Sequence, residues 1–178
     1  MDTETFWHVI DEARHQVADA TDGEAVAAHA AALLARHPRG EIVAAQQIFW
    51  DLMAASYRSP LWAAAYMING GCSDDGFDYF RGWLIVQGRD VFERAVSDPD
   101  TLADHPALRA AEAAGMDLEC EAALGIAWDA HLAATGEELP ADAFTIRYPD
   151  LDPDWDEAFQ DDEEAARRLP GLAAIYLD

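Results

Sequence analysis

The chain has 178 residues, and 35 Asp and Glu residues stand against only 11 basic residues, all of them Arg, which gives a formal net charge of -24. The absence of lysine excludes Schiff-base catalysis and lysine-dependent phosphate loops, and so negative a field excludes nucleic acid and anionic membranes as partners. Hydrophobic residues make up 51% of the chain, so we expect the charge to coat a folded, single-domain body.

Helical periodicity continues through the first 136 residues. Apolar residues at helical spacing, Pro and Gly breaks, and Ser or Asp caps predict helices at 3–21, 24–37, 41–57, 61–68, 74–87, 90–96, 107–114 and 118–134. The predicted fold class is therefore all-α, with a single compact domain of about seven or eight helices.

The C-terminal part of the chain has a different character. Four of the eight prolines follow residue 135, nine of the fifteen residues at 150–164 are acidic, and 145–148 is the only fragment that alternates like a strand. We therefore divide the chain into a helical domain, 1–136, and an irregular, acidic, Pro-containing extension, 137–178. The apolar residues 172–177 are expected to dock this extension back on the body.

Three motifs that the sequence lacks indicate the cellular compartment of the protein. Cys72 and Cys120 follow no metal-ligand or CxxC spacing, which fits a reducing environment. The N-terminus has no basic region followed by an apolar stretch, so we expect no signal peptide. No window of eighteen uninterrupted apolar residues is present, so we expect no membrane span. The sequence thus predicts a cytoplasmic protein.

The most distinctive passage is a Gly-Gly-Cys-Ser link between two predicted helices, 61–68 and 74–87. Ser73 suits the N-cap of the second helix, and Asp74 and Asp75 would then lie in its first turn, where the helix dipole favours carboxylates. The link therefore combines a helix cap with a thiol and two acidic groups.

Arg81 follows in the same helix, three residues after Asp78, so the two can pair along one face. Two roles for Arg81 remain open. Its guanidinium could be a planar fork for a carboxylate or phosphate ligand, with Asp74 or Asp75 as the acid or base. Alternatively, it is a buried clamp that holds the acidic loop to the body.

The remaining reactive side chains give weaker indications. A thiol just before a helix N-terminus, as at Cys72, can be activated by the helix dipole, but the two neighbouring Asp oppose a thiolate, and a small buried hydrophobe is the alternative. His131 lies one turn past Trp128 on an apolar face, which is typical of a core or pocket-lining histidine. The six histidines form no zinc motif, and we expect no metal and no cofactor.

The same passage, with Phe6-Trp7 near the N-terminus, resembles a family catalogued as domain of unknown function 4240, of actinobacterial type. The resemblance covers roughly residues 1–130 and leaves out the acidic C-terminal part. It implies a recurrent fold and a recurrent loop, and it implies no activity, substrate or catalytic residue. Its most specific residues are Asn69-Gly70-Gly71-Cys72-Ser73-Asp74-Asp75-Gly76-Phe77, followed by Phe80, Arg81, Trp83, Leu84 and Gly88.

Two functions are consistent with these features. The first is an interaction or inhibitor-type protein whose acidic surface binds a basic protein partner; the lack of a complete catalytic constellation favours it over an enzyme. The alternative is an enzyme or small-molecule binder with a pocket around the Asn69–Gly76 link, Arg81 and Trp83. The residues of the candidate ligand or partner site are Asn69, Gly70, Gly71, Cys72, Ser73, Asp74, Asp75, Asp78, Arg81, Trp83, Arg89 and His131.

Overall fold

A computed structural model gives the fold and describes residues 1–155 and 161–177. No strand occurs in these residues, which confirms the all-α prediction. There are more helices than predicted, because the extension contributes α9 and α10. The helices, with 3-10 helices marked η, are α1 (Thr3–Gln16), α2 (Gly23–Leu34), α3 (Arg39–Ala55), α4 (Ser59–Ile68), α5 (Asp74–Val86), α6 (Arg89–Ser97), η1 (Pro99–Asp104), α7 (Pro106–Ala114), η2 (Glu121–Gly125), α8 (Ile126–Thr135), α9 (Asp162–Arg168) and α10 (Pro170–Tyr176).

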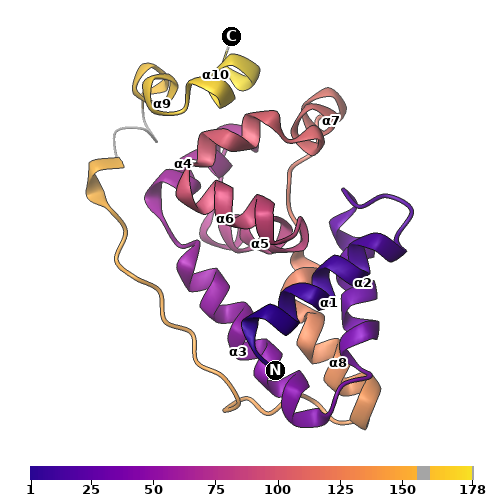
Figure 1. The fold of residues 1–178 in the computed structure, drawn as a ribbon. Coiled ribbons are helices and arrows are strands. Elements are labelled where there is room, and N and C mark those ends of the chain that lie inside the picture. Colours follow the sequence, from indigo (N-terminus) through magenta and orange to yellow (C-terminus); the bar gives the residue numbers. More distant parts are fainter. Residues whose placement is uncertain (156–160, 178) are drawn as a thin grey trace.

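The helices form two groups that meet at α5 (Figure 1). In the first group, α2 packs on α1 and α8, and α3 packs on α8. In the second group, η1 contacts α4, α6, α7 and α10. Helix α5 contacts both groups, through α2, α3 and η2 on one side and α4 and α6 on the other. The hydrophobic core therefore runs continuously through α5.

Helix α5 is buried along most of its length because its second half is almost entirely apolar. Every residue from Phe80 to Val86 is buried, including the guanidinium of Arg81. Gly82 allows η2 to approach closely, since a Cβ at this position would lie 2.8 Å from the carbonyl oxygen of Cys120. This contact fixes the connection 115–120 against the middle of α5.

The α-helix predicted at 118–134 is wrong in its first half, 118–125. The amide of Cys120 donates to the carbonyl of Tyr79 on α5, at 3.0 Å, so the backbone here bonds across to another helix instead of to its own next turn. The chain then forms η2, and α8 begins only at Ile126. Propensity predicted a continuous helix, and the tertiary hydrogen bond interrupts it.

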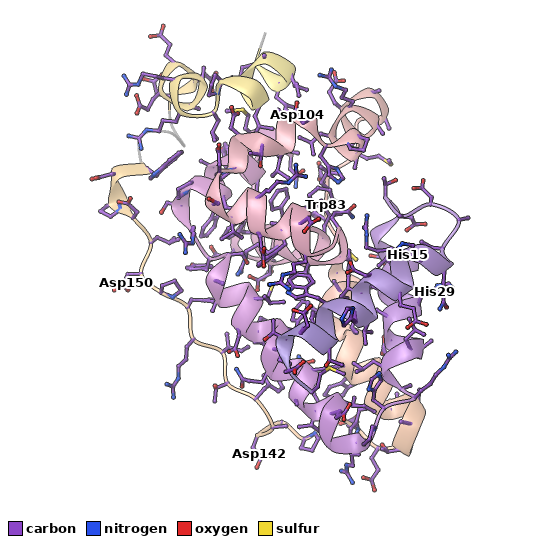
Figure 2. The ribbon with its side chains drawn as sticks, viewed as in Figure 1. His15, His29, Trp83, Asp104, Asp142 and Asp150 are labelled. Atoms are coloured by element: carbon purple, nitrogen blue, oxygen red, sulfur yellow. The ribbon has the colours of Figure 1, made fainter. Side chains whose placement is uncertain are left out.

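Residues 136–155, which we call the strap, run as mostly irregular chain beside α3 (Figure 1). Two aromatic pairs hold the strap to α3 and to the turn that follows it. Trp50 stacks on Phe144 with ring centroids 6.2 Å apart, and Tyr57 stacks on Tyr148 at 4.4 Å. Figure 2 shows Asp142 and Asp150 on the outer edge of the strap, away from the body. The strap thus turns its aromatic rings inward and its carboxylates outward.

The strand-like fragment 145–148 finds no neighbouring strand among the described residues. The side-chain amide of Gln47 takes the place of one. Its Oε1 accepts from the backbone N–H of Thr145 at 2.8 Å, and its Nε2 donates to the Thr145 carbonyl at 3.2 Å. The side chain of Gln47 therefore takes both backbone hydrogen bonds of one extended residue, and no β-ladder forms in this part of the described chain.

Beyond the strap, two short helices cover the second group. Asp161 caps α9, and Glu164 pairs with Arg167 and Arg168 on the same helix. Leu172 of α10 is fully buried, and α10 packs on η1 and α4. None of the helices in the described ranges is long and apolar enough to span a bilayer.

Candidate functional site

The glycine link is held rigidly at both ends. Asn69 accepts a hydrogen bond from the amide of Leu118 at 3.0 Å, and Trp62 donates from Nε1 to the carbonyl of Cys72 at 3.2 Å. Ser73 caps α5 by accepting from the amide of Gly76 at 3.1 Å. Gly70 lines a small cavity of about 200 Å³ under α9 and α10. The link therefore joins two helices by a fixed turn.

The acidic groups of the first turn of α5 stay in solvent. Asp74 and Asp75 are exposed, and neither forms an ion pair within the described residues. They lie at the positive end of the helix dipole, where a carboxylate is favoured. Their position is that of helix-stabilising residues beside the Ser73 cap.

The thiol of Cys72 is poorly suited to nucleophilic chemistry. Burial, and then the negative charge of Glu119, raise its pKa to about 12. The thiolate is the reactive form of cysteine, so Cys72 stays protonated at neutral pH. The neighbouring Asp117 and Asp74 act in the same direction as Glu119.

Arg81 makes its contacts inside the protein. Its guanidinium is fully buried, donates from Nε to the Phe77 carbonyl at 3.2 Å, and donates through its two terminal nitrogens to the Met53 carbonyl and to Asp78. Three aromatic rings surround the guanidinium carbon at 4.6 to 5.0 Å from their centroids, namely Tyr57, Phe77 and Tyr148. This is a clamp between α3, α5 and the strap.

Trp83 faces a different side of α5, because residues two apart on a helix point away from each other. Its indole packs edge-on against His105, at a centroid distance of 5.7 Å, and against Phe80. The remaining two candidates lie elsewhere. Arg89 at the start of α6 pairs with Glu4 and Glu93, and His131 is buried in α8, bonded through Nδ1 to the Glu137 carbonyl. The candidate residues therefore do not converge on one cavity.

A groove that the sequence did not indicate lies beside Trp83. It has a volume of about 410 Å³, and we call it the acidic groove. Its walls come from the α1–α2 loop, from α5, and from α7 with the connection that follows it. It is lined by Asp19, Thr21, Asp22, Gly23, Glu24, Trp83, Ala107, Ala110, Ala111, Met116, Asp117, Leu118 and Glu119.

The groove combines an apolar floor with an acidic rim. The lining residues Trp83, Ala111 and Leu118 are buried, and Met116 beside them is 63% exposed. The rim has five carboxylates, and the lining has neither Arg nor His. In the described part of the chain, none of these five acidic residues forms an ion pair. The rim carboxylates are Asp19, Asp22, Glu24, Asp117 and Glu119.

Crowding of negative charge is visible in the pKa values around the groove. Burial, and then the charge of Asp117, raise the pKa of Glu119 above its ordinary value. Burial, with Glu24 and Asp22 as further causes, raises the pKa of the Cys120 thiol to about 12. Each of these shifts would be reduced by a cation placed in the groove.

The loop at one end of the groove is pre-formed. Asp19 accepts from the amide and the hydroxyl of Thr21, at 2.8 and 2.6 Å, and these bonds lower the pKa of Asp19. Asp22 caps α2 through the amide of Ala25 at 3.1 Å. The two carboxylates are thus held in place by hydrogen bonds to the neighbouring residues of the chain. No group of three or more metal-ligating side chains that could hold an ion occurs in residues 1–155 and 161–177.

A family model matches most of the chain. The model of a family described as a protein of unknown function, DUF4240, matches residues 1–132. The chain belongs to the DUF4240 family. The DUF4240 match begins before α1 and ends within α8, so it contains the glycine link, Arg81 and every residue that lines the acidic groove. Among the curated proteins and the solved structures, no match to the chain was found.

The strap, α9 and α10 lie outside the DUF4240 match. The clamp around Arg81 crosses this boundary, because Tyr148 of the strap supplies one of its three aromatic rings. The family predicted from the 69–89 segment is confirmed. In this chain, the glycine link holds the start of α5 in place.

Proposed function

We propose that this protein is an interaction protein that binds a basic protein partner in the acidic groove. The observation that supports the proposal is the rim of five carboxylates without a counter-ion around an apolar floor. A lysine or arginine side chain has an apolar stem and a cationic head. The floor at Trp83 and Met116 suits the stem, and the rim suits the head.

The charge of the whole molecule supports the same function. With a net charge of -24, the protein attracts basic partners at long range and accelerates their encounter. The groove adds short-range attraction for a basic side chain, because charge-assisted hydrogen bonds are strongest where water is partly excluded. Binding would relieve the repulsion between Asp117 and Glu119.

The alternative, a small-molecule pocket around the link, Arg81 and Trp83, has less support. The guanidinium of Arg81 is fully buried and bonded within the protein. Trp83 lies on the other side of α5, in the floor of the groove. The two side chains that would bind a small anion at the link, Arg81 and Trp83, therefore make their contacts in other parts of the protein.

The test compares two variants that each remove two negative charges. Asp117→Asn/Glu119→Gln changes the groove rim, and Asp142→Asn/Asp150→Asn changes the outer edge of the strap. Each immobilised protein is used to recover partners from a cell lysate, which are identified by mass spectrometry. We expect a basic protein to be retained by the wild type and the strap variant, and bound at least about tenfold more weakly by the groove variant.

Salt provides the second arm of the test. Retention of the partner should fall strongly between about 0.1 and 0.5 M NaCl, where screening shortens to a few ångström. If both variants retain the same proteins as the wild type at both salt concentrations, the groove is not the binding surface. The strap variant controls for the loss of net charge alone.

A further inference from the structure

The strap lies on the helical body in the way that an extended peptide lies on a receptor. It has no helix from 137 to 152, and its residues 144–148 contact a surface formed by α3, the turn after α3, and α5. We call this surface the strap-binding face. The face lies inside the segment 1–132 that matches the DUF4240 family, and the strap lies outside that match. The residues of the face are Gln47, Trp50, Tyr57, Asp78 and Arg81.

One contact of the face is with the backbone of the strap. The side-chain amide of Gln47 accepts from the N–H of Thr145 at 2.8 Å and donates to the carbonyl oxygen of the same residue at 3.2 Å. Every residue except proline has these two backbone groups, so other residue types can take the position of Thr145. Paired bonds to one unit of extended backbone are also how a sheet edge binds a peptide. The face therefore selects an extended conformation.

Two aromatic side chains of the strap make the specific contacts. Phe144 stacks on Trp50, with ring centroids 6.2 Å apart. Tyr148 stacks on Tyr57 at 4.4 Å, and the guanidinium carbon of Arg81 lies 4.9 Å from the centroid of the Tyr148 ring. Stacking and cation–π contacts require an aromatic ring at each position. The face thus selects two aromatic residues that lie four positions apart.

The strap is held weakly compared with the face beneath it. None of the residues 140–155 is buried, and Phe144 and Tyr148 are only half-buried. In this stretch, Thr145 is the only residue whose backbone is hydrogen-bonded to a helix. Arg81 of the face, by contrast, is fully buried. A segment with so few buried contacts opens locally at a free energy well below that of global unfolding. The strap can therefore leave the face while the helices stay folded.

Charge makes the strap an unfavourable occupant of the face. The strap contains six acidic residues and one basic residue, which account for only a small part of the net charge of -24. Asp150 and Asp152 of the strap line a cavity of about 660 Å³ together with Asp51 of α3, and the basic residue that lines this cavity is Arg58. Repulsion between the acidic strap and the acidic body opposes docking of the strap. A basic segment on the same face would be attracted to the body.

We propose that the strap-binding face is a docking site for an extended, basic segment of a partner protein with two aromatic residues four positions apart. The strap occupies this site in the free protein and competes with the partner segment. On binding, the segment takes the place of the strap, with its backbone on Gln47 and its two rings on Trp50 and Tyr57. The site shares no residue with the acidic groove, so the proposal does not rest on the function proposed for that groove.

Three fluorescently labelled peptides test the site by fluorescence anisotropy with the full chain. The probe has the sequence of residues 141–155 with Asp150→Lys and Asp152→Lys. The second peptide has the unchanged sequence, and the third is the probe with Phe144→Ala and Tyr148→Ala. At constant ionic strength, we expect the probe to bind at least about tenfold more tightly than either of the other two. The second peptide controls for charge, and the third controls for the aromatic contacts.

Variants of the strap in the full chain test the competition. Tyr148→Ala removes one aromatic contact of the strap and keeps every residue of the face. We expect this variant to bind the probe about tenfold more tightly than the wild type does, because the face is free in a larger fraction of the molecules. Phe144→Ala removes the other aromatic contact and should act in the same direction. Ile146→Ala changes a strap side chain that is 48% exposed and should bind the probe as the wild type does.

The proposal is overturned if the Phe144→Ala and Tyr148→Ala variants, shown to be folded by circular dichroism, bind the probe no more tightly than the wild type does. Equal binding of the probe and the alanine peptide would contradict it as well. Probe binding that is about tenfold weaker in Asp117→Asn/Glu119→Gln would place the probe in the acidic groove. A wild-type dimer in sedimentation that Tyr148→Ala dissociates would assign the face to the strap of a second copy. Either of these two results also overturns the proposal.

Discussion

A guanidinium removed from water loses its hydration, and the surroundings of Arg81 compensate with hydrogen bonds and aromatic faces. The pair with Asp78 was expected from the spacing along one helix. Tyr148, whose hydroxyl lies 3.4 Å from Asp78, is 70 residues away in sequence, so no local pattern could indicate it. The same holds for the carbonyl of Met53 at the end of α3. From the sequence alone, Arg81 could therefore either bind a ligand through its planar guanidinium or act as a buried clamp.

Arg81→Ala should lower the free energy of unfolding by about 3–5 kcal/mol, because it leaves Asp78 and the Met53 carbonyl without their partner. Urea denaturation followed by circular dichroism measures this loss. Asp78→Asn is the control and should cost less, since the Asp78 side chain is 28% exposed. A loss below about 1 kcal/mol for Arg81→Ala would show that Arg81 does not act as a clamp.

At the scale of elements, short helices depend on partners outside themselves. Helix α10 has only seven residues, and its own N-cap position, Leu169, offers no side-chain acceptor. The carboxylate of Asp100 on η1 replaces the cap, because its two oxygens accept from the amides of Gly171 and Leu172, each at 2.9 Å. Residues 172–177 were predicted to dock because they are apolar, but this tertiary cap could not be predicted from sequence.

Asp100→Ala should destabilise the docked α10 by about 1 kcal/mol, with a range of roughly 0.5–2 kcal/mol for a lost N-cap. Native-state hydrogen exchange at the amides of 171–176 measures the local effect, and exchange in α2 should be unchanged. Asp104→Ala removes an exposed carboxylate from the same η1 and is the matched control. Equal protection of α10 in both variants would contradict the capping role.

Helix limits were predictable where a local signal marked them. Ser73 begins α5 and Pro60 lies in the first turn of α4, as their residue types indicate. The predicted helix limits were wrong at 118–125, where the backbone amide of Cys120 bonds to α5. They were also wrong at 162–168, where the acidic composition gave no sign of a helix that Glu164 stabilises by pairing with two arginines. Both failures arise from interactions that a local propensity does not contain.

At the scale of the whole molecule, the net charge of -24 acts on stability. In the described residues only five carboxylates pair with an arginine, so most are left without one; the five are Glu4, Asp78, Glu93, Glu137 and Glu164. Mutual repulsion of so many like charges destabilises the compact state. The acidic groove concentrates this repulsion, and the sequence could not reveal it because its walls come from three separated segments, 19–24, Trp83 and 107–119.

Raising the NaCl concentration from about 10 to 500 mM should therefore stabilise the fold by about 1 kcal/mol, or roughly 2–4 °C in Tm. Differential scanning calorimetry measures the change. A screening effect levels off once the Debye length falls below the spacing of the charges, whereas a general salting-out effect continues to rise. A Tm that falls with NaCl would mean that the few surface ion pairs outweigh the repulsion.

The strap has a consequence for how the molecule can move. It leaves the first group of helices at the end of α8, passes along α3, and leads to the second group, where α10 docks (Figure 1). A hinge motion between the two groups would have to separate Tyr57 from Tyr148 or withdraw α10 from η1. These contacts therefore oppose a relative movement of the two groups, and the acidic groove has walls from both. The binding that we propose for the acidic groove should therefore occur with little change in the width of the groove.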